Sequence, residues 1–256
     1  MIMENQVEIK LLGAFEVSHT PEIKATKLRQ LLAMLAVNAN VVVSTEQLID
    51  ELWPYGPPRS VKTIVQTYVY QLRKTFSRGF DPSRGVELLV TRPGGYVLEV
   101  PRTNIDVFQF LSLVESGRNT LHQGQAGRAA DLLHQSLRLW RGPVFADVTS
   151  GLSLRGLSVF LEEQRLEALA LCMEADLAND RHREIVGELR LLVSKHQLNE
   201  SFHILLMRAL HRSGRRGEAL RAYSQLHRVL DEELGLEPSV EAKRAQREIL
   251  EAQPMG

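Results

Sequence analysis

The sequence predicts two domains of different class, an α+β domain at the N-terminus and an all-α domain after it. Apolar residues alternate along Val7–Val17 and on both sides of Pro93-Gly94-Gly95, which is the pattern of short strands. From Asn104 onward apolar residues recur every three or four positions, which is the period of helices. We therefore expect one domain at 1–103 and the other at 104–256.

The composition is that of a folded protein whose charge is unevenly placed. The 256 residues are 44% apolar, which is enough for a core in each domain, and 31 basic side chains balance 31 acidic ones. The segment Arg59–Arg92 nevertheless holds seven basic and two acidic residues, a local net charge of +5. A basic segment in a neutral chain is modest support for a nucleic-acid partner.

Cysteine content and hydropathy predict a cytoplasmic protein. Cys172 is the single cysteine, and no CxxC motif or closely spaced Cys/His pair is present, so we expect no disulfide, no metal ion and no cofactor. The first residues, MIMENQVEIK, lack the basic charge and apolar stretch of a signal peptide. The longest apolar run, Leu31–Val37, has seven residues, whereas a membrane-spanning helix needs about 18.

The N-terminal domain opens with short strands and two helices. The strand pattern at 7–17 is followed by helical spacing of leucines over 26–38 and by a short strand at 41–43. Ser44 then precedes a helix over 45–53, where it is placed to cap the first turn.

A third helix turns a polar and basic face outward. It begins at Ser60, after the proline-rich turn 54–58 has ended the second helix, and it runs to Phe76. Its apolar residues share one face of the helix: Val61, Ile64, Val65, Tyr68, Val69, Leu72 and Phe76. The opposite face carries Lys62, Thr63, Gln66, Thr67, Tyr70, Arg73 and Lys74.

A hairpin follows the third helix. Two alternating runs, 86–92 and 96–100, meet at Pro93-Gly94-Gly95, which places Arg92 at the tip. Helix, rigid turn, helix and basic hairpin in this order predict a winged helix-turn-helix, which binds DNA.

The outward face of the third helix has the chemistry that major-groove recognition requires. Arg73 and Lys74 can neutralise phosphates or donate to guanine, and Gln66 can pair with adenine. An arginine at the hairpin tip can reach an adjacent minor groove. Tyr70 leaves two interpretations open, a DNA contact or partial burial. The predicted DNA-binding residues are Arg59, Lys62, Thr63, Gln66, Thr67, Tyr70, Arg73, Lys74 and Arg92.

The second domain contains a degenerate internal repeat. Helical periodicity predicts helices at 106–121, 126–140, 154–179, 182–196, 200–213, 216–233 and 239–251. The sequence matches itself at a shift of 34 residues, which places Leu171 and Ala175 on Leu205 and Ala209. Repeats of this length are typical of stacked antiparallel helix pairs, so we expect a domain like those of tetratricopeptide repeats (TPR).

Several motifs resemble one known family over nearly the whole chain. Residues 5–100 resemble the OmpR-type winged helix through LRQLLAMLAVNANVVVSTEQLIDELWP, YQLRKTF and TRPGGYVLEV. The second half resembles the bacterial transcriptional activator domain (BTAD) through LRLWRGPVFADV, LEEQRLEALALCMEADLA and GRRGEALRAYSQLHRVLDEELGLEPS. Together the two halves resemble the Streptomyces antibiotic regulatory proteins.

This resemblance implies a specific activity. Proteins of the family are expected to activate a secondary-metabolite gene cluster by binding direct repeats of promoter DNA near the −35 element as a side-by-side dimer. They are also expected to recruit RNA polymerase holoenzyme through contacts that include its sigma factor. The resemblance carries the recognition-helix role to 62–74 and the wing role to Arg92. We expect no phosphoacceptor receiver domain upstream, and so no switch by phosphorylation of an aspartate.

Two other functions stay open from the sequence. The TPR-like half could make the protein an interaction adaptor, or it could sense a pathway metabolite. The sequence lacks the motifs of nucleotide-binding proteins, metalloproteases, hydrolases and kinases. We therefore expect that the protein is not an enzyme. If DNA is the partner, Arg73→Ala should cost about 1–3 kcal/mol of specific binding, and Arg92→Ala should weaken binding without unfolding the protein.

Overall fold

The computed structural model describes residues 7–79 and 88–251. Packing divides the chain into two compact units: unit 1 combines Met1–Leu113 with Gln135–Arg165, and unit 2 combines Val114–His134 with Leu166–Gly256. These units are defined by contacts between residues, whereas the domain boundary at 103/104 was predicted from the sequence pattern. That boundary stays a prediction. Within the described ranges, every helix is too short or too polar to cross a membrane.

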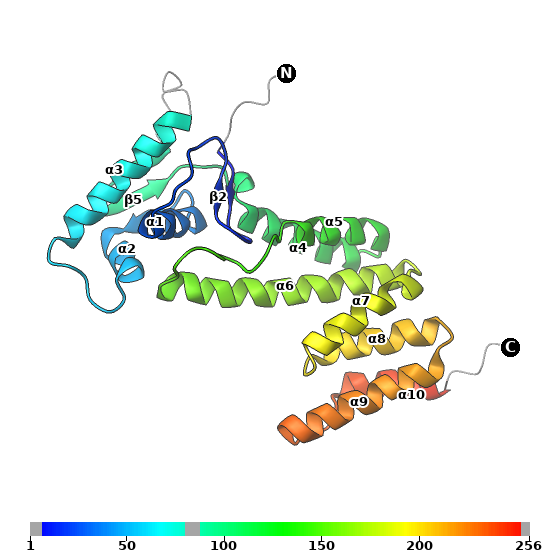
Figure 1. The fold of residues 1–256 in the computed structure, drawn as a ribbon. Coiled ribbons are helices and arrows are strands. Elements are labelled where there is room, and N and C mark those ends of the chain that lie inside the picture. Colours follow the sequence, from blue (N-terminus) through cyan, green and yellow to red (C-terminus); the bar gives the residue numbers. More distant parts are fainter. Residues whose placement is uncertain (1–6, 80–87, 252–256) are drawn as a thin grey trace, which may run out of the picture. The chain divides into compact units, whose positions relative to one another are not determined.

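The N-terminal part of unit 1 is the predicted winged helix-turn-helix (Figure 1). Its helices are α1 (Thr26–Val37), α2 (Thr45–Leu52) and α3 (Val61–Gly79). Strands β1 (Ile9–Lys10) and β2 (Glu16–Val17) form one antiparallel pair. A second, antiparallel sheet has the order β3-β5-β4, with β3 at Val43–Ser44, β4 at Leu89–Arg92 and β5 at Gly95–Leu98.

Apolar faces of the three helices and the sheet form the core of this part. Apolar residues of α2 and α3 pack there, among them residues that the helical spacing placed on the inner face of α3, and those fully or almost fully buried are Leu48, Leu52, Val65, Val69, Leu72 and Phe76. Contacts join α1, α2 and α3 to one another, and α1 also packs on β5. The amphipathic pattern therefore predicted the inner face of the helix-turn-helix correctly.

One predicted strand differs in the structure, and part of another lies outside the described residues. The strand expected at 41–43 lies at Val43–Ser44, and Val41 and Val42 are 50% and 46% exposed. Asn40 ends the preceding turn with a positive φ of 67°, so regular pairing starts only beyond these two valines. The first hairpin strand was expected from 86; residues 86 and 87, with the charged Asp81 and Arg84, lie outside the described residues.

Carboxylates join the winged helix to the segments 105–113 and 135–165 of the same unit. The short 3-10 helix η2 (Arg102–Asn104) leads into α4 (Asp106–His122), which begins at Asp106. The Asp106 carboxylate accepts hydrogen bonds from the backbone N–H of Leu11 at 2.8 Å and of Leu12 at 2.9 Å. Burial raises the pKa of Asp106, and these two hydrogen bonds together with Arg141 offset part of that rise. Asp147 accepts from the Phe15 N–H at 2.6 Å.

Glu51 makes a further connection of this kind, from α2. This glutamate of α2 is 1% exposed, and its carboxylate accepts from the backbone N–H of Gly151 at 2.6 Å and of Ser153 at 2.9 Å. These N–H groups lie at the beginning of α6 (Leu152–Ala178), where a helix has no internal partners for them. The helix-turn-helix and the start of α6 are thus held together by buried, charge-assisted hydrogen bonds.

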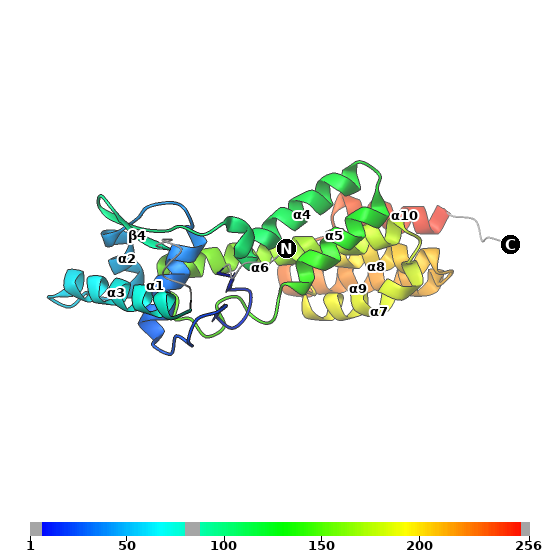
Figure 2. The same ribbon diagram turned by 90° about the horizontal axis from the view of Figure 1, so that it is seen from above.

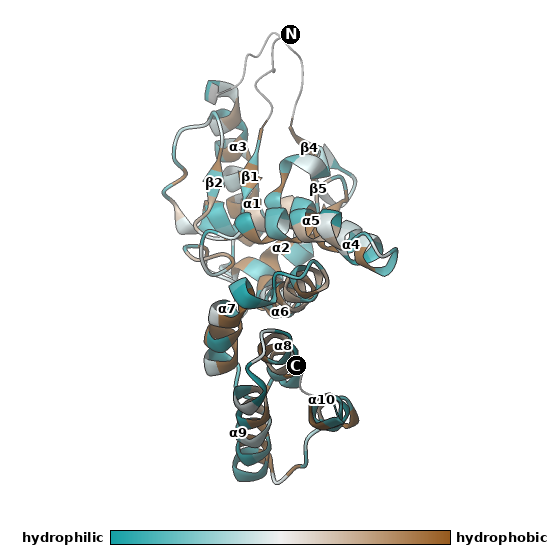
Figure 3. Ribbon diagram, turned by 90° about the vertical axis from the view of Figure 1, so that its right-hand side faces the viewer, coloured by the Kyte–Doolittle hydropathy of each residue, from teal (hydrophilic) through white to brown (hydrophobic). Residues whose placement is uncertain are grey.

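Unit 2 is a stack of helices that confirms the TPR-like prediction. It contains parts of α4, α5 (Ala126–Arg138) and α6, followed by α7 (His182–Lys195), α8 (Glu200–Arg212), α9 (Arg216–Leu234) and α10 (Val240–Glu251). Helix α8 packs against α7, α9 and α10, and α7, α8 and α9 lie side by side (Figure 2). Apolar and polar residues alternate around α9 and α10 (Figure 3), as amphipathic helices require.

Two glycines of unit 2 give opposite predictions for one substitution. A Cβ at Gly187, within α7, would meet no atom within 4 Å, so Gly187→Ala should raise the free energy of unfolding by up to about 1 kcal/mol. A Cβ at Gly117, within α4, would lie 2.7 Å from Leu133 Cγ, so Gly117→Ala should lower it. Urea unfolding of both variants checks this, and a stabilising Gly117→Ala would contradict the packing of α4 on α5.

Candidate nucleic-acid interface

Helix α2 is built to support the helix that follows it. The Ser44 side chain accepts a hydrogen bond from the Gln47 N–H at 3.1 Å, and Gln47 Oε1 accepts from the Ser44 N–H at 2.9 Å, which forms the capping box that the sequence indicated in part. Trp53, at the end of α2 just before the proline-rich turn, stacks on Tyr68 of α3 with ring centroids 6.2 Å apart. The ammonium of Lys27 lies 5.5 Å from the Trp53 ring, and burial lowers the pKa of this lysine.

Most of the predicted DNA-binding residues form one exposed face. Arg59 lies in the turn before α3, and the predicted residues that are exposed on α3 itself are Lys62, Thr63, Gln66, Thr67, Tyr70 and Lys74. Tyr70 is 64% exposed, which excludes partial burial, and its contact with DNA stays a prediction. Thr67 donates its hydroxyl to the Thr63 carbonyl at 2.9 Å, so its oxygen is left to accept. We call this set, with Arg59, the recognition face.

Arg73 departs from the predicted outward position. It is half-buried, its Nε donates to the Leu89 carbonyl at 2.8 Å, and its Nη2 donates to Thr91 Oγ1 at 2.9 Å. Both acceptors belong to β4, so Arg73 connects α3 to the hairpin. This side chain positions the wing relative to the recognition face, a role that the helical spacing alone could not indicate.

The wing is the β4–β5 hairpin, and its turn approaches β3 closely. A Cβ at Gly95 would lie 2.1 Å from the Val43 carbonyl oxygen, so only glycine fits this position. Gly94, with φ of 83°, accepts a hydrogen bond from the Thr45 N–H at 3.0 Å, which ties the turn to the start of α2. Arg92 is the last residue of β4, next to the tip, and its Nη2 contacts Glu99 Oε1 at 2.7 Å.

The electrostatics of this surface suit a polyanion. The sequence of α3 contains Lys62, Arg73, Lys74 and Arg78 and no acidic residue. The ion pair of Arg92 with Glu99 is half-exposed on both sides, so it contributes little stability and a phosphate could replace the carboxylate. Among the described residues, basic side chains of this segment thus lie on α3 (Lys62, Lys74, Arg78) and on the wing (Arg92).

Sequence reasoning missed the partners that fix these side chains. Thr91 and the Leu89 carbonyl hold Arg73, Glu99 holds Arg92, and Glu51 anchors α2. A signal was present for Glu51, since it lies three residues after Leu48 and therefore on the inner face of α2. A charged residue on an apolar face predicts a buried polar contact, whereas no local pattern identifies the partners of Arg73.

The position of Arg73 leads to a prediction of energetic coupling. If Arg73 acts through the wing, the loss of DNA affinity in Arg73→Ala, about 1–3 kcal/mol, should overlap with the loss in Arg92→Ala. A double-mutant cycle measured by fluorescence anisotropy should then give a coupling above about 0.5 kcal/mol. Lys74→Ala with Arg92→Ala is the matched cycle and should be additive. Additive losses in the Arg73 cycle would show that Arg73 acts independently of the wing.

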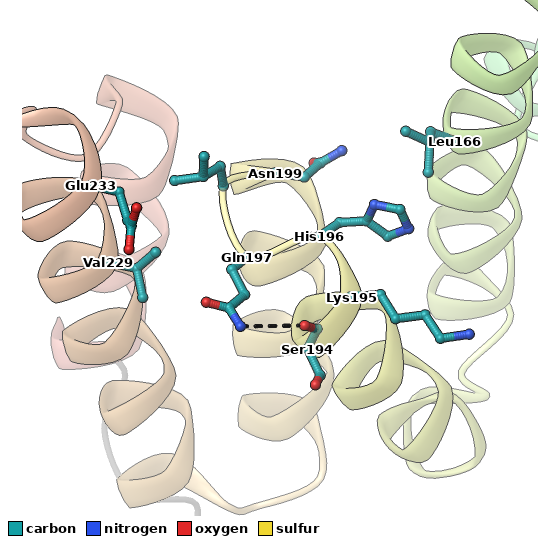
Figure 4. A pocket seen from close by; sticks show the side chains of 9 residues that line it. Leu166, Ser194, Lys195, His196, Gln197, Asn199, Val229 and Glu233 are labelled. Carbon is teal, nitrogen blue, oxygen red and sulfur yellow. Dashed lines mark hydrogen bonds between the residues drawn. The ribbon is translucent and has the colours of Figure 1, made fainter. Parts of the chain in front are cut away.

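Unit 2 has an open hollow of about 690 Å³ on its surface, lined by residues of α6, the α7–α8 connection and α9 (Figure 4). Gln197 donates to the Ser194 carbonyl at 3.4 Å at its centre. Among its lining residues, all within the described ranges, only Val229 is buried. Small-molecule sites usually enclose their ligand, so this hollow gives less support to metabolite sensing than the recognition face gives to DNA binding.

Comparison with known proteins assigns both halves of the chain. Residues 21–98 match the family described as transcriptional regulatory protein, C terminal, and residues 105–250 match the bacterial transcriptional activator domain. The regulatory protein DnrI of Streptomyces peucetius is 38% identical over 97% of this chain and 93% of its own length. The transcriptional regulator RedD of Streptomyces coelicolor is 37% identical over 97% of this chain and 72% of its own length.

A solved structure has the same fold. Mycobacterium tuberculosis EmbR, in complex with a low-affinity phosphopeptide, superposes with a TM-score of 0.90 at 30% identity, over 99% of this chain and 67% of that one. The winged helix with its recognition face, the TPR-like helices and these relatives agree with one another. The chain therefore belongs to the Streptomyces antibiotic regulatory protein family of transcriptional activators.

Proposed function

We propose that this activator binds direct repeats near the −35 element of promoters in an antibiotic gene cluster. The recognition face of α3 would lie in the major groove, with Arg92 of the wing at the adjacent minor groove. Lys62, Lys74 and Arg59 would contact phosphates, and Gln66 would pair with a base edge. Its site of action would be the bacterial chromosome, in the cytoplasm.

The observation that carries this proposal is the combination of shape and charge on α3. A helix about 10–12 Å across fits the major groove. The exposed side of α3 presents amide, hydroxyl and ammonium groups, and its sequence lacks any carboxylate that would repel phosphate. An adaptor that bound protein through this face would have no need for such a consistent charge.

The proposed partners come from the resemblance to the family and from the proposed binding to repeated DNA. Two copies side by side would place their α3 helices in successive major grooves, about 10–11 bp apart. The DNA-bound pair would then recruit RNA polymerase holoenzyme, including its sigma factor, through surfaces that the DNA leaves uncovered.

Footprinting of the purified protein on promoters beside its own gene tests the proposal. We expect protection of direct repeats in steps of about one helical turn, and affinity that falls linearly with salt on a double-logarithmic plot. Addition of polymerase holoenzyme should extend the protection over the −35 element. A protein that leaves these promoters unprotected, yet shifts its melting temperature with a pathway product, would instead be a metabolite-binding regulator.

A further inference from the structure

Three side chains with metal-binding atoms meet inside unit 2. His134 of α5 and Cys172 and Asp176 of α6 each offer one ligand atom, and these atoms all lie within 4.8 Å of one another. His134 Nε2 is 3.0 Å from Asp176 Oδ2, although the two residues are 42 positions apart in the chain. Cys172 and Asp176 are four residues apart, so they share one face of α6. We propose that His134, Cys172 and Asp176 bind a zinc ion.

The ligand set fits the preferences of zinc. Zinc takes nitrogen, thiolate sulfur and carboxylate oxygen at about 2.0–2.3 Å, so its ligand atoms lie within about 4 Å of one another. The widest separation in the cluster exceeds this by less than about 1 Å, which a side-chain rotation of Cys172 or His134 can close. Three protein ligands leave the fourth tetrahedral position to water. The His134 side chain is 35% exposed and provides a route for the ion.

A neighbouring arginine orients the carboxylate. Arg181 Nη1 contacts Asp176 Oδ1 at 2.8 Å, which leaves Oδ2 directed toward His134. Groups that hold the ligands of a metal in this way fix their orientation. The positive charge of Arg181 is shared with Glu184, whose carboxylate lies 2.7 Å from Arg181 Nη2, so the repulsion felt by a second cation is reduced.

Binding of zinc would turn the buried Cys172 thiol into a thiolate ligand. When zinc binds, the S–H bond breaks, a Zn–S bond forms and the proton passes to the buffer. The thiolate and the carboxylate then both face the ion, and His134 would supply a ring-nitrogen lone pair.

The sequence led us to expect no metal because it lacks a closely spaced pair of cysteine or histidine ligands. The structure supplies the missing proximity, since packing of α5 on α6 brings His134 to the Cys-x3-Asp pair. An ion at this position would join α5 to α6 within unit 2. Because it binds only the folded arrangement, it would stabilise that helix pair.

Cobalt provides the sharpest readout, because it replaces zinc in tetrahedral sites and absorbs light. The full chain is stripped of metal with a chelator, dialysed and titrated with Co²⁺. We expect one equivalent to bind, with a thiolate-to-cobalt charge-transfer band in the near ultraviolet and intense visible bands of tetrahedral cobalt. Zn²⁺ should displace it and raise the melting temperature. Cys172 is the single cysteine, so the charge-transfer band reports on this residue alone.

Variants of each ligand test the assignment. Cys172→Ala should abolish the charge-transfer band, and His134→Ala and Asp176→Asn should each lower zinc affinity at least about tenfold, measured by competition with a chromophoric chelator. His122→Ala, an exposed histidine at the end of α4, is the matched control and should bind like the wild type. Circular dichroism without metal checks that every variant folds.

Three results would overturn the proposal. One is a titration without the thiolate band, another is zinc affinity unchanged in His134→Ala, and the third is an equal loss in His122→Ala. If Cys172→Ala does not fold, Cys172→Ser retains the side-chain volume. His134→Ala, at a half-exposed position, decides the question independently of the buried cysteine.

Discussion

Glu51→Ala should lower the free energy of unfolding by about 3 kcal/mol. The Glu51 carboxylate is buried and accepts hydrogen bonds from Gly151 at 2.6 Å and Ser153 at 2.9 Å. A hydrogen bond to a charged group contributes about 1.5–3 kcal/mol, and its loss leaves buried N–H groups without a partner. Gln30 also donates to the Glu51 main-chain carbonyl at 2.7 Å, and this contact survives the substitution.

Urea unfolding of the full chain measures this effect. Glu46→Ala, at an exposed position on the same helix, is the matched control and should change stability by less than about 0.5 kcal/mol. Glu51→Gln keeps the shape but loses the charge, so we expect an intermediate value. Equal stability of the Glu51 and Glu46 alanine variants would show that α2 does not depend on the beginning of α6.

Removal of three basic side chains should reduce DNA binding more than any single change. In the triple variant Lys62→Ala, Lys74→Ala and Arg92→Ala, each lost phosphate contact lowers the salt slope by about 0.9, so the slope should become shallower by about 3. Affinity at physiological salt should fall more than about tenfold. Gel shifts or anisotropy at several salt concentrations measure both quantities.

The control for this variant removes the same charge elsewhere. Arg183, Arg208 and Arg247 are exposed residues of unit 2, and their replacement by alanine lowers the net charge of the protein equally. If the recognition face binds phosphate, the control should retain most of the wild-type slope. Equal losses in the two triple variants would mean that only overall charge attracts the DNA.

Local patterns of the sequence predicted those features that depend on local geometry. The 3.6-residue period located the helices of the second half to within about two residues, because each helix buries one stripe of its own surface. The same period separated the buried Val65 and Leu72 from the exposed Gln66 and Lys74 on α3. Ser44 was recognised as a cap because capping involves only neighbouring residues.

Features that depend on contacts between distant segments could not be predicted in this way. Arg73 has the spacing of an exposed residue, yet it turns toward Leu89 and Thr91 on the hairpin. The boundaries between the compact units fall within α4, α5 and α6, so each of these helices contributes residues to both units. Helical periodicity locates a helix but does not indicate such a division. His134 and Asp176 likewise meet only through packing of α5 on α6.

Tethered cleavage of DNA tests most directly whether the recognition face lies in the major groove. Cys172 is buried, so a cysteine introduced by Gln66→Cys can be labelled selectively with an iron–EDTA cleavage reagent. The labelled protein should cut promoter DNA within the major groove of each repeat, at positions about one turn apart. Cutting no stronger than that from the same reagent at Arg208→Cys, in unit 2, would contradict the placement of α3 on DNA.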